Sequence, residues 1–160
     1  MMVKVMRPIF QPEGDSKFVL YPYWIFHLKL FYKRLGRSDR VLDYYVYVDL
    51  YRLGAERGDG FIELYEWDVD ERQVMEPLVD YEEAKIKAFE SAIHWGNIKI
   101  ISWWLPRIEI VREAMAYKVF WVFERDGEKF VMDSLDGKEF RLRDLTRIER
   151  RPTCRGLRCR

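Results

Sequence analysis

An alternation of side chains is the feature that most limits how this chain can fold. Between Phe18 and Lys33 the even-numbered positions are apolar or aromatic, whereas the odd-numbered positions include His27 and Lys29. A repeat of two places successive side chains on opposite faces of a β-strand. From Val41 to Arg52 the even positions are again apolar, and the odd positions from Asp43 onward are aspartates and tyrosines. The sequence therefore predicts two long strands, each with one buried face.

Turn residues connect these strands and mark later ones. The segment Arg34–Arg40 contains glycine, serine and aspartate, which predicts a hairpin between the two long strands. Further strands are expected over Phe61–Trp67, Ile98–Val111 and Met115–Glu124. Two Asp-Gly pairs, at 126–127 and 136–137, supply the positive backbone angles of tight hairpin turns.

One segment has the signature of a helix. Asp80 can cap the first turn, and Glu83, three residues later, completes a capping box. Apolar residues then recur at helical spacing from Tyr81 to Ile93. Gly96 is expected to end this helix.

These elements predict an α+β fold, a curved antiparallel sheet of about six to seven strands packed on one main helix. A single domain is expected over residues 1–151, followed by a flexible basic tail over 152–160. Val46–Asp49 resembles Phe130–Asp133, and each follows an aromatic strand. This echo fits two pseudo-duplicated halves of the sheet, and it fits equally a chance similarity of short aromatic hairpins.

The composition indicates the temperature and the compartment in which the protein works, and it indicates no reaction. Glutamine, asparagine and threonine occur at only five positions, while Arg, Lys, Glu and aromatic residues are abundant, a balance typical of hyperthermophiles. No apolar run reaches the length of a membrane span, and the first ten residues do not have the pattern of a signal peptide. We therefore expect a soluble cytoplasmic protein without a membrane partner.

The second half of the chain carries a family resemblance. The run Tyr117–Asp133, followed by Gly137, resembles the hairpin of PepSY-type domains, and the segment Glu82–Ile93 occupies the place of their helix. The resemblance covers about half of the chain and transfers no catalytic residue. It implies a small binding or inhibitory module.

The chain has more aromatic side chains than one buried sheet face needs. A wet face rich in tyrosine and tryptophan favours a protein partner or a homodimer. With nearby cations, the same rings can stack single-stranded bases while the cations contact phosphates, so nucleic-acid binding is the second hypothesis. The predicted aromatic face comprises Tyr21, Tyr23, Tyr45, Tyr47, Tyr51, Trp103 and Trp104. The predicted basic patch comprises Lys29, Lys33, Arg34, Arg52, Arg141, Arg143, Arg147, Arg150 and Arg151.

Acidic residues give a third hypothesis. The region 56–90 has a net charge of −8, and the region 138–160 has a net charge of +6, so the two can attract each other within one chain or between two. Oxygen-rich clusters can hold a metal for hydrolysis, yet the acidic residues near the 68–71 turn fit no calcium loop and favour a solvated edge. The two histidines, His27 and His94, and the pair Cys154 and Cys159 have no spacing typical of zinc sites. No catalytic residue, metal or cofactor is predicted. The acidic cluster itself comprises Glu63, Glu66, Asp68, Asp70 and Glu71.

Overall fold

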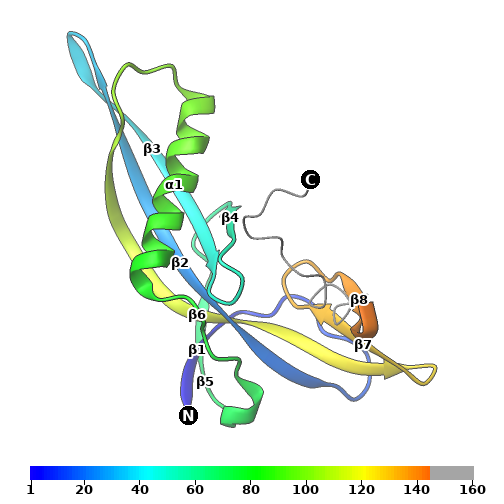
Figure 1. The fold of residues 1–160 in the computed structure, drawn as a ribbon. Helices are drawn as coiled ribbons and strands as arrows, with labels where there is room; N and C mark the ends of the chain where they lie inside the picture. The colour runs from blue at the N-terminus through cyan, green and yellow to red at the C-terminus, as the bar shows by residue number, and fades with distance from the viewer. Residues whose placement is uncertain (145–160) are drawn as a thin grey trace, which may run out of the picture. The chain divides into compact units, whose positions relative to one another are not determined.

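The protein combines a strand-rich open sheet with one main helix. The structure is a computed structural model that describes residues 1–144, and it confirms the predicted α+β class (Figure 1). Those residues contain eight strands rather than six or seven. The strands are β1 (Met2–Met6), β2 (Lys17–Arg34), β3 (Arg37–Asp49), β4 (Ala55–Gly58), β5 (Leu64–Asp68), β6 (Arg107–Arg125), β7 (Glu128–Asp133) and β8 (Glu139–Arg141). The helices are α1 (Tyr81–Lys99) and a short 3-10 helix, η1 (Glu71–Gln73).

The chain forms two compact units. The first contains residues 1–7 and 20–118, and its strands follow the order β4-β3-β2-β6-β1-β5. β1 runs parallel to β6 at Val5↔Tyr117 and antiparallel to β5. The second contains residues 8–19 and, within the described part, 119–144, where β6 pairs with β7 and β7 pairs with β8. The predicted tail over 152–160 lies outside the described residues.

The core of the first unit lies between α1 and one face of β2 and β3. The even-numbered side chains of β2 from Phe26 to Tyr32 are buried there, as the alternation predicted. β2 pairs antiparallel with β3, so Phe26 stands opposite Val46 and Leu28 opposite Tyr44. Small residues on α1, among them Ala88, let the helix backbone approach the sheet closely. Burial of this face is the main source of the unit's stability.

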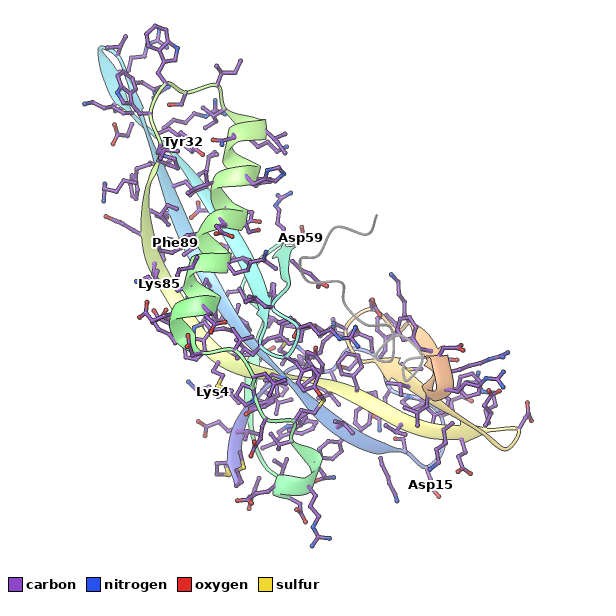
Figure 2. All side chains as sticks on the ribbon, in the orientation of Figure 1. Lys4, Asp15, Tyr32, Asp59, Lys85 and Phe89 are labelled. Carbon is purple, nitrogen blue, oxygen red and sulfur yellow. The ribbon has the colours of Figure 1, made fainter. Side chains whose placement is uncertain are left out.

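The start of α1 and its Asp80 cap agree with the prediction, but within residues 1–144 Glu83 does not complete the predicted capping box, and the predicted end is wrong. The Asp80 carboxylate accepts a hydrogen bond from the Glu83 amide at 2.9 Å, which caps the first turn. The helix continues past Gly96 to Lys99, so the predicted ending at Gly96 is wrong. Gly96 is instead a buried interior residue, and its missing side chain makes room for Tyr32, which Figure 2 labels beside the C-terminal half of α1.

The strand predicted over Ile98–Val111 is wrong for residues 98–106 and confirmed for residues 107–111. Ile98 belongs to the last turn of α1, a loop follows to Pro106, and β6 begins at Arg107. β6 then runs without interruption to Arg125, which joins the end of the predicted 98–111 strand to the predicted 115–124 strand. The sequence 98–105 is apolar but does not alternate, and most of its side chains are exposed. The prediction treated this apolar segment as a buried strand, but the segment is an exposed loop for most of its length.

The second unit contains the first Asp-Gly hairpin. Asp126 and Gly127 both have positive φ, 53° and 74°, as a two-residue primed turn requires. β6 and β7 pair antiparallel on either side of this turn. At the second Asp-Gly pair only Gly137 has a positive φ, so that connection is of another type.

Tyr81, the first residue of α1, links the helix to its surroundings and makes stability depend on pH. Its ring centroid lies 4.9 Å from that of Trp24, and its hydroxyl donates to a Glu113 carboxylate oxygen at 2.8 Å. Burial, assisted by the Glu113 carboxylate, raises the pKa of Tyr81 to about 12. The folded state thus holds this proton more tightly than the unfolded state, whose tyrosine pKa is about 10.

The contribution of Tyr81 to stability should therefore be complete below pH about 10 and lost as pH rises from about 10 to about 12. We expect Tyr81→Phe to make the free energy of unfolding fall less steeply over this interval than in the wild type. Urea unfolding measured across this alkaline range checks the difference between the two proteins. Equal slopes would contradict the assignment of the raised pKa to Tyr81.

Candidate functional site

Five of the seven predicted aromatic residues lie on or beside β2 and β3. The ring of Tyr21 lies 5.5 Å from that of Tyr23 and 5.8 Å from that of Tyr51, between centroids. On the same hairpin, Tyr45 stacks on His27 with a centroid distance of 4.3 Å. Tyr47 completes the set on β3. The hairpin therefore brings these tyrosines into one region of the first unit.

Most of these tyrosines have contacts within the fold. The Tyr21 hydroxyl donates to both carboxylate oxygens of Asp49 at 2.8 Å, and burial raises the pKa of Tyr21 well above its usual value. The Tyr47 hydroxyl donates to the Gly60 carbonyl at 2.6 Å. Tyr23 is only 7% exposed. These side chains support the hairpin, and their role as a contact surface stays a prediction.

The two predicted tryptophans lie elsewhere, in the loop between α1 and β6. Figure 1 shows this loop beside the turn that joins β2 to β3. Trp103 is 89% exposed, and its neighbours Ile101 and Leu105 are 98% and 76% exposed. Leu35, in the β2–β3 turn, is exposed at the same end of the unit. Exposed apolar side chains thus gather where the two connections meet.

We name this region the tryptophan tip. Between the two connections lies an open pocket of about 510 Å³, lined by side chains from both. The tip comprises the apolar residues Leu35, Ile101, Trp103, Trp104 and Leu105 and the cations Lys33, Arg34, Arg40 and Lys99.

The pocket of the tip is electrostatically one-sided, since among the described residues four cations and no carboxylate line it. The Lys33 ammonium lies 5.6 Å from the centroid of the Trp104 ring, within the range of a cation–π contact. The Arg34 guanidinium donates to the Ser38 carbonyl at 2.8 Å. The side chains of Arg40 and Lys99 have no hydrogen bond or ion pair with another group in residues 1–144. Two cations are therefore available to a ligand.

The predicted basic patch is only partly gathered at this site. Lys33 and Arg34 line the pocket, whereas Lys29 lies further along β2 and Arg52 follows β3. Arg141 and Arg143 belong to the second unit, where both face Glu128, at 3.8 Å and 3.0 Å. The remaining predicted cations, Arg147, Arg150 and Arg151, lie outside the described residues.

Sequence reasoning missed Arg40 and Lys99 as members of the site. Arg40 was taken for a turn residue, and Lys99 falls in the segment predicted as a strand. Their positions depend on the helix continuing to Lys99 and on the loop folding back beside the hairpin. An apolar run without alternation that ends at Pro106 was the one available signal that 98–105 is a loop.

Three of the five residues of the acidic cluster make contacts that support the fold. Glu63 pairs with Arg7 at 3.1 Å, and Asp68 pairs with the amino terminus at 2.8 Å. Asp70 caps η1 through the Arg72 amide. Within residues 1–144 no group of three or more His, Cys, Asp or Glu side chains is placed to hold a metal ion. No observation therefore favours metal-assisted hydrolysis at this turn.

Within residues 1–144 the two histidines add no candidate site. His27 lies 2.8 Å from an Asp43 carboxylate oxygen on the partly exposed face of the hairpin, and His94 is exposed on α1. Cys154 and Cys159 lie outside the described residues.

No helix in the described part of the chain is long and apolar enough to cross a membrane. Comparisons with models of protein families, with curated proteins and with solved structures find no match. The tryptophan tip is therefore the feature of the described residues on which a functional proposal can rest.

Proposed function

We propose that this chain is a non-catalytic protein-interaction module and that the tryptophan tip is its contact surface. The observation that carries the proposal is the exposure of Trp103, Ile101 and Leu105 together at one end of a unit. Contiguous exposed apolar side chains on a folded protein mark interaction sites, and tryptophan and arginine dominate the energetics of such sites. The tip supplies both kinds of residue.

The tip is a better contact surface than the tyrosines of the hairpin. The hydroxyls of Tyr21 and Tyr47 are already bonded within the fold, and Tyr23 is buried. A partner that displaced these side chains would have to break existing hydrogen bonds. By contrast, Trp103 has no ring contact with any residue in 1–144, so binding would cover it at no such cost.

Self-association is the simplest form of the proposal, and it predicts a concentration-dependent mass. We expect the triple variant Ile101→Ser/Trp103→Ser/Leu105→Ser to weaken association by about 2 kcal/mol or more, because truncated anchor residues typically cost that much. Sedimentation equilibrium over a range of concentrations measures the change.

A matched control removes exposed apolar side chains of the same unit away from the tip. Leu78→Ser/Ile86→Ser is suitable, since both residues are exposed. Association should persist in this control. A wild-type chain that stays monomeric at high concentration would exclude self-association, and equal weakening in both variants would exclude the tip as the surface.

Single-stranded nucleic acid is the second candidate, and one observation favours it. Lys33 lies over the Trp104 ring in a pocket lined by cations, and stacking rings with nearby cations are what single-stranded nucleic acids require. Binding of a labelled oligothymidylate of about 20 nucleotides should then weaken steeply between about 50 and about 200 mM salt. The absence of binding, or binding that does not change with salt, would exclude single-stranded nucleic acid as the ligand.

A further inference from the structure

The charge of the tip pocket defines what can occupy it. Arg40 and Lys99 line it without an ion-pair partner in residues 1–144, and Arg34 has only a carbonyl as acceptor. Because no carboxylate of residues 1–144 lines the pocket, an occupant with negative charges would be attracted and a cationic one repelled. The pocket thus selects anionic groups.

The apolar side chains at the pocket further limit the chemical class of its ligand. Leu35 and Ile101 line the pocket with aliphatic side chains beside the cations, and Leu105 is exposed further along the same loop. Nucleic acids offer phosphates and flat bases, which leave aliphatic side chains of this kind without a matching group. A polypeptide can place carboxylates on the cations and, within the same few residues, aromatic or aliphatic side chains on the rim.

We propose that the occupant of the tip pocket is an acidic polypeptide segment that carries aromatic or aliphatic side chains between its carboxylates. This inference rests on the proposed function and names the chemistry of the partner. Its carboxylates contact Arg40 and Lys99, and an apolar side chain covers Trp103. Lys33 already lies over Trp104, so Trp103 is the ring left for the partner.

The test uses the full chain and fluorescently labelled probes of defined chemistry. A random copolymer of glutamate and tyrosine has both required groups, poly-glutamate has carboxylates alone, and oligothymidylate has phosphates and bases. We expect the copolymer to bind at least about tenfold more tightly than poly-glutamate, and its binding to weaken with salt. Fluorescence anisotropy measures all three affinities.

Variants then locate the binding. Arg40→Glu/Lys99→Glu should lower the affinity for the copolymer by about tenfold or more, because it reverses both free cations of the pocket. Trp103→Ser should remove the preference for the copolymer over poly-glutamate. Arg72→Glu/Lys87→Glu makes the same change in net charge away from the tip and should leave the affinity within about twofold of the wild type.

Each outcome decides the inference. Copolymer binding that is absent, or that the control reduces as much as the tip variant, would overturn it. Tighter binding of oligothymidylate, lost in the tip variant, would replace it with the nucleic-acid reading. If the copolymer fails to bind but the serine variant of the tip still abolishes self-association, this inference is wrong and the proposed function stands.

Discussion

Replacing Gly96 with alanine is expected to lower the free energy of unfolding by about 2–3 kcal/mol, the cost of forcing an extra group into a packed core. The sign is opposite to the usual one, because alanine in a helix interior is normally more stable than glycine by about 0.5–1 kcal/mol. A Cβ atom at Gly96 would overlap the Tyr32 hydroxyl oxygen and lie 2.9 Å from Cζ of the same ring. Tyr32 is almost fully buried between β2 and α1 and cannot move aside without disturbing the core. Chemical denaturation of the variant measures the loss.

Two further variants identify the cause. Asn97→Ala changes the next, exposed position of α1 and should be neutral or slightly stabilising. The Tyr32 hydroxyl has no hydrogen-bond partner in residues 1–144, so Tyr32→Phe should cost little by itself and recover part of the loss in Gly96→Ala. If Gly96→Ala stabilises the protein as Asn97→Ala does, the contact between Tyr32 and the helix is not formed.

Asp49→Ala is expected to cost about 3 kcal/mol, since donors left without an acceptor in a partly buried site cost about 1–3 kcal/mol each. The Asp49 carboxylate accepts from the Tyr21 hydroxyl and from the amides of Tyr51 and Arg52, each at 2.8 Å. It therefore holds the chain as it leaves β3 and fixes the Tyr21 ring. Denaturation of the variant, compared with Tyr21→Phe, separates the amide bonds from the hydroxyl bond.

A matched aspartate on the same strand provides the control. Asp43 is exposed, and within residues 1–144 its carboxylate bonds only to His27, so Asp43→Ala should change the free energy of unfolding by less than about 1 kcal/mol. Should Asp49→Ala prove as mild as Asp43→Ala, the turn after β3 does not depend on this carboxylate.

Local patterns in the sequence were sufficient for the main strands and for the start of the helix. The alternation in β3 and in the Phe26–Tyr32 part of β2 indicates one buried face, and Asp80 caps α1 through a residue only three positions away. Both signals act over a few residues, so no knowledge of distant contacts is needed. The turn at Asp126 and Gly127 is of the same kind.

Elements that depend on distant parts of the chain were not predictable in this way. β1 pairs with β5 across more than fifty residues, and nothing within Met2–Met6 specifies that partner. Gly96 resembles a helix end until Tyr32, from another element, is known to occupy the space beside it. Pseudo-duplication, the PepSY resemblance and thermophily stay predictions.

The candidate site was likewise predictable only where local sequence was enough. Trp103 and Trp104 were singled out from the sequence, but as part of a sheet face with the tyrosines. The structure places them in a loop with Arg40 and Lys99, which the sequence does not mark. The position of a loop depends on the elements that it joins. The sequence predicted neither the end of α1 at Lys99 nor the start of β6 at Arg107, so it could not place the loop between them.

The central claim is that the tryptophan tip is a surface for a partner and not part of the chain's own core. The free energy of unfolding of Ile101→Ser/Trp103→Ser/Leu105→Ser, compared with that of the wild type under conditions where both are monomeric, tests this most directly. We expect a difference within about 0.5 kcal/mol, as for exposed positions in general. A loss of about 3 kcal/mol or more, typical of truncation in a core, would contradict the account.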